Sequence, residues 1–182
     1  SINDNNYEIN LKVRDKGFLS VFYKFNGKYF AKGKIEGGEM FSSFYSQSWK
    51  TEKKRRDIKI GFKNKKVSEL FVDPKEKEKI RIRVKGEKFV DPLTSFLNML
   101  KGKKASKTID GRRIYSMVLT NEEQKFGVYK KNILIKDYLN LWAEHNRNDL
   151  KSISFEKKEG EKEIFFPNKI SIKYKKITFK LI

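Results

Sequence analysis

Two arginines interrupt the hydrophobic alternation of their segments, and they carry the clearest chemical signal in the sequence. Arg56 and Arg113 each share the parity of the apolar residues that follow them. Those residues are Ile58, Ile60 and Phe62 after Arg56, and Tyr115, Met117 and Leu119 after Arg113. Successive side chains of a β-strand point to opposite faces. Each guanidinium is therefore expected at the end of an apolar face.

A guanidinium in such a place needs a carboxylate, backbone carbonyls, water or a bound anion, because burial of an unpaired charge is costly. One interpretation is structural: an internal ion pair, or a side chain that reaches the rim of the sheet. The other is a binding site for an anion-headed apolar ligand, with the head on Arg56 and Arg113 and the tail on the six apolar residues. The sequence leaves both interpretations open.

Residues that could support enzymatic chemistry are scarce. His145 is the only histidine, it lies in the polar segment His145–Asp149, and the chain has no cysteine. A histidine-based metal site and a catalytic triad would both depend on this one residue. The glycines at Gly37-Gly38 and Gly102 are in hairpin and helix-end contexts rather than in a phosphate-binding loop. We therefore expect a non-enzymatic protein with no catalytic residues, no metal site and no cofactor.

The charge balance points to an anionic partner. The 182 residues include 43 Lys+Arg and 23 Asp+Glu, for a formal charge of +20. Such a field attracts nucleic acid, anionic lipid or another polyanion. Only eight of the 43 cations are arginine, the residue that grips phosphates and guanine edges with two hydrogen bonds. The alternative explanation of the charge is compositional, because Lys, Asn, Ile, Phe and Tyr abound together, as AT-rich coding produces. We favour this explanation over nucleic-acid binding.

Alternation of apolar and polar residues runs through most of the chain and predicts short β-strands. Strands are expected at 7–13, 19–25, 29–35, 41–49, 58–62, 67–72, 80–84, 109–119, 153–155, 164–166, 170–174 and 177–181. Asn26-Gly27 predicts a hairpin turn, since both residues tolerate positive φ. The stretch 132–145 fits a strand or a helix face, and we favour a strand that runs into an irregular loop. A slip of parity at Lys175-Lys176 indicates a bulge or a turn.

One segment has the pattern of a helix. Asp91 is a suitable N-cap, Pro92 fits the first helical position and Gly102 ends the segment. Between them lies one apolar stripe, formed by Leu93, Phe96, Leu97 and Leu100. About ten short strands with one helix predict an all-β, mainly antiparallel fold. We expect a single domain over residues 1–182: a strongly curved sheet, half-barrel or barrel with one short helix at about 92–101.

The aromatic residues between positions 22 and 49 have two interpretations. They are expected to form core, and the alternative is a platform on which nucleic-acid bases stack. The residues concerned are Phe22, Phe25, Tyr29, Phe30, Phe41, Phe44, Tyr45 and Trp49.

Two motifs resemble a known family. The segment Val90–Leu100, with its Asp-Pro-Leu-Thr-Ser helix start, and Ile109–Tyr115, with its Asp-Gly-Arg-Arg, resemble the bacterial exported proteins grouped as domain of unknown function 3108, alphaproteobacterial type. Weaker similarity at Tyr7, Arg55-Arg56 and Phe166–Ile170 extends the resemblance over nearly the whole chain. Members of that family often carry cysteines before the Asp-Gly-Arg-Arg motif and in the following strand, which this chain lacks, so a redox role is not expected.

The resemblance implies a periplasmic or envelope location after removal of a signal peptide, and a curved antiparallel sheet similar to periplasmic lipoprotein carriers. It implies no activity. We therefore expect a non-enzymatic periplasmic protein that binds an anionic lipid or another envelope component in an apolar concavity. The alternative is a structural or adhesion module whose lysine faces lie on anionic membrane, peptidoglycan or a protein partner of unknown identity. Nucleic-acid binding is the third hypothesis.

Overall fold

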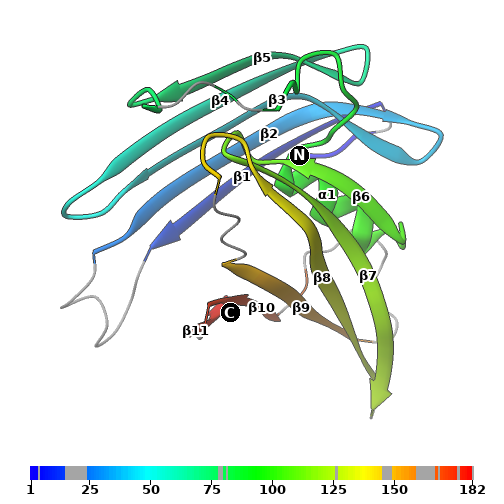
Figure 1. Cartoon of the computed structure of the whole chain (residues 1–182). Helices are drawn as coiled ribbons and strands as arrows, with labels where there is room; N and C mark the ends of the chain where they lie inside the picture. Colours follow the sequence, from blue (N-terminus) through cyan, green and yellow to red (C-terminus); the bar gives the residue numbers. More distant parts are fainter. Residues whose placement is uncertain are drawn as a thin grey trace.

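The structure, a computed structural model, describes residues 1–3, 5–14, 24–77, 80, 82–125, 127–144, 149–158, 167, 169–175 and 177–181. These residues form a mostly antiparallel β structure with one short helix (Figure 1). The predicted all-β class is therefore confirmed. The strands lie in two separate sheets, and among the described residues neither sheet closes into a barrel.

The two sheets divide the chain between them. Sheet A has the order β1-β2-β3-β4-β5 and sheet B the order β11-β10-β9-β8-β7-β6, so neighbours in sequence are neighbours in space. Sheet A consists of β1 (Asn6–Arg14), β2 (Asn26–Glu36), β3 (Glu39–Lys50), β4 (Arg55–Lys63) and β5 (Lys66–Asp73). Sheet B consists of β6 (Ala105–Ile109), β7 (Arg113–Lys125), β8 (Val128–Asn140), β9 (Leu150–Lys158), β10 (Lys169–Tyr174) and β11 (Ile177–Leu181).

The predicted helix is present as α1 (Pro92–Leu100), between the two sheets in the chain and in space (Figure 1). It starts where expected, because the Asp91 side chain accepts hydrogen bonds from the backbone N–H groups of Leu93 and Thr94 and Pro92 occupies the first position. It ends at Leu100 with Lys101 as the C-cap, and Gly102 follows with a φ of +91°, which suits glycine. The helix contacts β2 and β3 on one side and β6 and β7 on the other.

Each sheet has its own apolar core. The inner face of sheet A packs with Leu97 of α1 and with Val84, Ile109 and Leu141. The inner face of sheet B packs with Phe96 and Met99 of α1. Because neighbouring side chains of the helix point into different cores, α1 fills the space between the sheets and serves both.

The expected hairpin at Asn26-Gly27 is wrong. Both residues belong to β2, where Gly27 is paired with Val13 of β1 and Trp49 of β3. A Cβ on Gly27 would lie 2.9 Å from ring atoms of both Phe25 and Tyr29. Glycine is required here because aromatic rings press against the backbone. The resulting Asn-Gly pair has the same sequence pattern as a hairpin turn.

The strand predicted at 80–84 is also wrong, since the described residues 80 and 82–84 lie outside every strand. Val84 is nevertheless buried and packs in the core of sheet A. The chain then runs beside β5, where the Gly86 N–H donates to the Val67 carbonyl and the Val67 N–H donates to the Glu87 carbonyl. The predicted segments 19–23 and 164–166 lie outside the described residues, as does His145.

The favoured alternative for the stretch 132–145, a strand, is confirmed for residues 132–140, which belong to β8. At the parity slip, Lys175 lies in a turn that follows β10, and Lys176 lies outside the described residues.

The aromatic segment 41–49 is split between two faces. Residue 43 is an extra residue in the pairing of β3, since Phe44 pairs with Lys32 and Ser42 with Gly33. This bulge places Phe41 and Phe44, of opposite parity, on the same outer face. Tyr45 remains on the inner face and is fully buried. The prediction that the aromatics form core therefore holds for Tyr45 and is wrong for the half-buried Phe41 and Phe44.

Candidate functional site

Arg56 lies at the inner face of β4, as its parity predicts, with 15% of its side chain exposed. Its Nη1 donates to the carbonyl of Pro74 at 2.8 Å and forms an ion pair with Glu76 Oε1 at 2.9 Å. Burial lowers the pKa of the guanidinium; the Glu76 charge opposes this shift, and the neighbouring Arg112 adds to it. The Nε atom of Arg56 is buried without a hydrogen-bond partner among the described residues.

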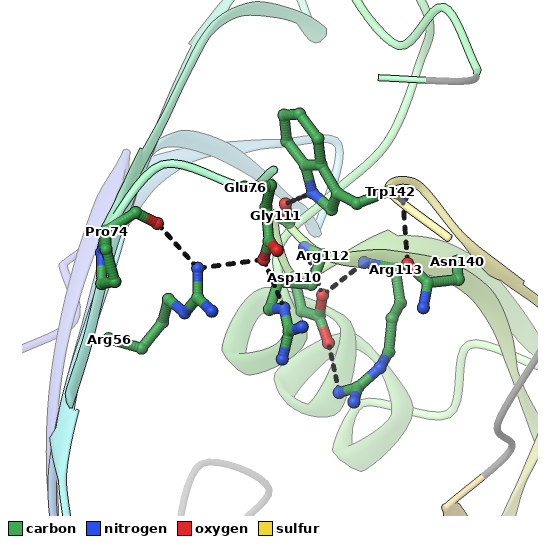
Figure 2. Close-up of polar contacts among 9 residues, drawn as sticks. All are labelled: Arg56, Pro74, Glu76, Asp110, Gly111, Arg112, Arg113, Asn140 and Trp142. Carbon is green, nitrogen blue, oxygen red and sulfur yellow. Dashed lines mark hydrogen bonds and ion pairs between the residues drawn. The ribbon is translucent and has the colours of Figure 1, made fainter. Parts of the chain in front are cut away.

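Glu76 joins two arginines from different sheets. Its Oε1 also accepts a hydrogen bond from Arg112 Nε at 2.9 Å (Figure 2). Arg112 lies in the turn between β6 and β7, so the ion pairs connect sheet A to sheet B. Because Arg112 lies in the turn before β7, strand parity does not set the direction of its side chain. The residue that shares a carboxylate with Arg56 is therefore Arg112 and not Arg113.

Arg113 has its own carboxylate partner. Its Nη1 lies 3.7 Å from Asp110 Oδ2, and the guanidinium lies over the ring of Tyr138 at 5.6 Å. The other oxygen of Asp110, Oδ1, accepts the backbone N–H groups of Arg112 and Arg113 at 2.8 and 2.7 Å. Asp110 thus shapes the turn and neutralises Arg113, which is the internal ion pair that the structural interpretation expected.

The turn that carries these arginines is inserted into the core of sheet A. Gly111 is buried with φ +87°, and a Cβ added to it would lie 2.4 Å from Ile58 Cγ2. Its carbonyl accepts a hydrogen bond from the indole Nε1 of Trp142 at 3.0 Å (Figure 2). We call this arrangement of Arg56, Glu76, Asp110, Gly111, Arg112, Arg113 and Trp142 the inter-sheet junction. Its contacts hold the two sheets together.

The six apolar residues predicted to meet a ligand tail do lie on the inner faces, but they are packed. Ile58 and Ile60 are fully buried in the core of sheet A, with Phe62 packed against it. Tyr115 and Met117 are buried in the other core, with Leu119 packed against that one. The two sets therefore line separate cores on either side of α1.

Two surface hollows lie away from these residues. One, of about 400 Å³, is lined by Ser1, Asn3, Asn6, Tyr7, Glu8, Lys32, Gly33, Lys34 and Ser43. The other, of about 710 Å³, is lined by Leu134, Lys151, Ser152, Lys173 and Lys175. Neither includes Arg56, Arg113 or any of the six apolar residues.

The most deeply buried carboxylate belongs to Asp91 and has a structural task. Its oxygens accept hydrogen bonds from Ser42 Oγ at 2.6 Å, Thr94 Oγ1 at 2.5 Å, and the backbone N–H groups of Leu93 and Thr94 at 2.9 and 3.0 Å. Burial raises the pKa of this carboxyl, and the donated hydrogen bonds act against that shift. Tyr7 extends the network through its hydroxyl, 2.5 Å from Thr94 Oγ1. The network fastens α1 to sheet A.

The outer face of sheet A, turned away from α1 and sheet B (Figure 1), is rich in cations. Register and exposure place on it Lys12, Arg14, Lys28, Lys32, Lys34, Lys50, Arg55, Lys59, Lys63 and Lys66. The carboxylates placed there in the same way are fewer: Glu8, Glu36, Glu39, Asp57, Glu69 and Asp73. No helix or strand of the described chain covers this face.

Phenylalanines lie among these lysines. Phe30, Ser46, Lys59 and Phe71 form one row across β2 to β5. The Lys59 ammonium is 5.8 Å from the ring centre of Phe71, which is 52% exposed. The rings of Phe30 and Phe44 lie 6.1 Å apart, and Lys65 Nζ is 3.8 Å from the ring of Phe41. The set Phe30, Phe41, Phe44 and Phe71 is named the outer phenylalanines below.

Sequence patterns pointed to part of this geometry. Parity correctly placed Arg56 and Arg113 on inner faces. Glu76 and Tyr138 were missed, because a partner contributed by a loop or a distant strand leaves no local pattern. The exposure of Phe71 was also missed. Its position next to the inward-facing Val72 in the strand was the available signal, because adjacent side chains point to opposite faces.

The described residues contain no cluster of three or more His, Cys, Asp or Glu side chains arranged to hold a metal ion. The one helix in the described chain is too short to span a bilayer. Comparison with known proteins found no matching family model, no matching curated protein and no matching solved structure.

Proposed function

We propose that this protein is a non-enzymatic binding module that adheres to an anionic phospholipid surface through the outer face of sheet A. Its location, following the resemblance to exported proteins, is the periplasm. The observation that carries the proposal is the excess of exposed lysines over carboxylates on a face that no described element covers.

This proposal prefers surface adhesion to the capture of a lipid tail. The apolar residues expected to line a concavity are packed in two cores, and both candidate arginines have carboxylate partners. A ligand tail would have to displace α1 or part of a core, at a cost similar to that of opening a cavity. A surface of lysines needs no such rearrangement, because their ammonium groups are already in water.

A lipid surface fits this face better than nucleic acid does. Eight of the ten cations named above on the outer face are lysines, and the other two are Arg14 and Arg55. Lysine binds phosphate as a point charge and supplies no bidentate contact. Each lysine near an anionic bilayer contributes about 1 kcal/mol through the surface potential, regardless of headgroup pattern. A broad positive surface without a particular arrangement of charges is therefore sufficient for binding to an anionic membrane.

Sedimentation with vesicles tests the proposal. We expect the protein to bind vesicles of equimolar phosphatidylglycerol and phosphatidylcholine, to bind pure phosphatidylcholine weakly, and to lose affinity as salt rises. Lys28→Gln/Lys32→Gln, on the outer face of sheet A, should weaken binding by about 2 kcal/mol, or about thirtyfold.

The matched control is Lys107→Gln/Lys136→Gln, which removes the same charge from neighbouring exposed positions of sheet B. Its binding should stay close to that of the unmodified protein. Equal losses in the two variants would show that net charge alone attracts the vesicle, and equal binding to both vesicle types would remove the electrostatic basis of the proposal.

A further inference from the structure

We infer that the outer phenylalanines enter the headgroup region of the bilayer and give the adhesion a component that salt does not screen. This inference rests on the proposed function and deepens it: the lysines attract the surface, and the aromatic side chains then fix which face meets it.

The first support is that an aromatic side chain is exposed to water at a position where this exposure does not stabilise the fold. Phe71 is 52% exposed, more than any of the other large apolar residues exposed in the described chain. It lies on the same face as the half-buried Phe30, Phe41 and Phe44. The rings of Phe30 and Phe44 are neighbours, with centres 6.1 Å apart, and Phe71 is separated from Phe30 by two strands, at Ser46 and Lys59. Aromatic side chains set among cations on one face suit a membrane interface.

The second support is the position of the lysines relative to the rings. Lys59 lies at 5.8 Å from the ring centre of Phe71, and Lys65 at 3.8 Å from that of Phe41. Lys65 also pairs with Glu36, so Lys59 beside Phe71 is the lysine whose stem can lie along the ring while its ammonium reaches outward. On a bilayer, this arrangement would let the ammonium meet lipid phosphates while the ring enters the layer below them.

The third support is that the face is rigid. The row of Phe30, Ser46, Lys59 and Phe71 crosses four hydrogen-bonded strands, so these side chains keep their spacing. Beneath them Ile58 and Ile60 are fully buried. A preformed surface loses little conformational entropy when it binds.

The test compares Phe71→Ser with Leu134→Ser. Leu134 is a matched control, since it is an apolar residue 38% exposed on the outer face of sheet B. Binding to equimolar phosphatidylglycerol–phosphatidylcholine vesicles is measured at low salt and at about 0.5 M NaCl, where the Debye length is roughly 4 Å. At high salt we expect the unmodified protein and Leu134→Ser to bind more weakly than at low salt but still measurably, because salt does not screen the phenylalanine contribution. Phe71→Ser should bind about fivefold more weakly than either, since it loses the apolar contribution of one partly inserted ring.

A second variant, Phe71→Trp, should retain the salt-resistant binding or strengthen it, because tryptophan favours the membrane interface. Thermal unfolding of all three variants checks that the fold is intact. If the unmodified protein binds no vesicle at any salt, the proposed function and the inference both fail. If it binds only at low salt, or if Phe71→Ser matches Leu134→Ser, the inference alone fails. Retention of single-stranded oligonucleotide, weakened by Phe71→Ser and without vesicle binding, would replace the lipid by nucleic acid.

Discussion

Replacing Gly111 by alanine should destabilise the protein by about 2 to 5 kcal/mol. Two costs combine. The backbone at Gly111 has φ +87°, which costs an L-residue roughly 1 to 2 kcal/mol. The new Cβ would also lie 2.4 Å from Ile58 Cγ2, and overpacking of a core costs about 1 to 3 kcal/mol. Urea unfolding followed by circular dichroism measures the loss.

Gly102→Ala is the control for the first cost. Gly102 has φ +91°, but no atom lies within 4 Å of the position its Cβ would take. This variant should lose only about 1 to 2 kcal/mol. If the two variants lose the same stability, the β6–β7 turn is not inserted into the core of sheet A, and the description of the inter-sheet junction is wrong.

Asp91→Ala should cost about 2 to 5 kcal/mol. The variant loses an N-cap, worth about 0.5 to 2 kcal/mol, and leaves buried donors without an acceptor, at about 1 to 3 kcal/mol. Those donors are the hydroxyls of Ser42 and Thr94 and the first backbone N–H groups of α1. Denaturant unfolding measures the change in the free energy of unfolding.

Asp91→Asn keeps one acceptor oxygen and should lose less than Asp91→Ala. Asp73→Ala provides a contrast, because that carboxylate pairs with Arg55 at the surface, with 41% of its side chain exposed, and exposed ion pairs contribute about 0 to 1 kcal/mol. A loss at Asp91 no larger than the loss at Asp73 would mean that α1 is not fastened to sheet A through this carboxylate.

The elements that could be predicted from sequence are those fixed by nearest neighbours. The helix start depends on Asp91 and Pro92, which act within one turn, and the inward positions of Arg56 and Arg113 follow from strand parity. These were predicted, and the structure places them so.

Features set by contacts between distant segments could not be predicted. The bulge at residue 43 reverses the parity of β3, and nothing in the local sequence marks it. Gly27 resembles a turn residue although its role is to admit the rings of Phe25 and Tyr29. The carboxylate partner of Arg56 comes from the segment after β5, so its identity depends on how that segment crosses the sheet.

The packing of the candidate ligand-binding faces could not be predicted from the sequence for the same reason. Parity predicts which face a residue occupies, but it does not show whether two inner faces share one hollow or pack separately. Here α1 places Phe96 and Met99 in one core and Leu97 in the other. Because side chains fill the space between the sheets, the candidate binding surface is the outer face of sheet A rather than the inner faces.

The most direct test of membrane adhesion through this face uses single introduced cysteines. Because the chain has no native cysteine, an environment-sensitive fluorophore can be attached at Ser46→Cys, between Phe30 and Lys59 on the outer face of sheet A, or at Ser154→Cys on the outer face of sheet B. With anionic vesicles, we predict a blue shift of the emission at position 46 and no shift at position 154. A shift at position 154 alone, or equal shifts at both positions, would contradict the proposed orientation.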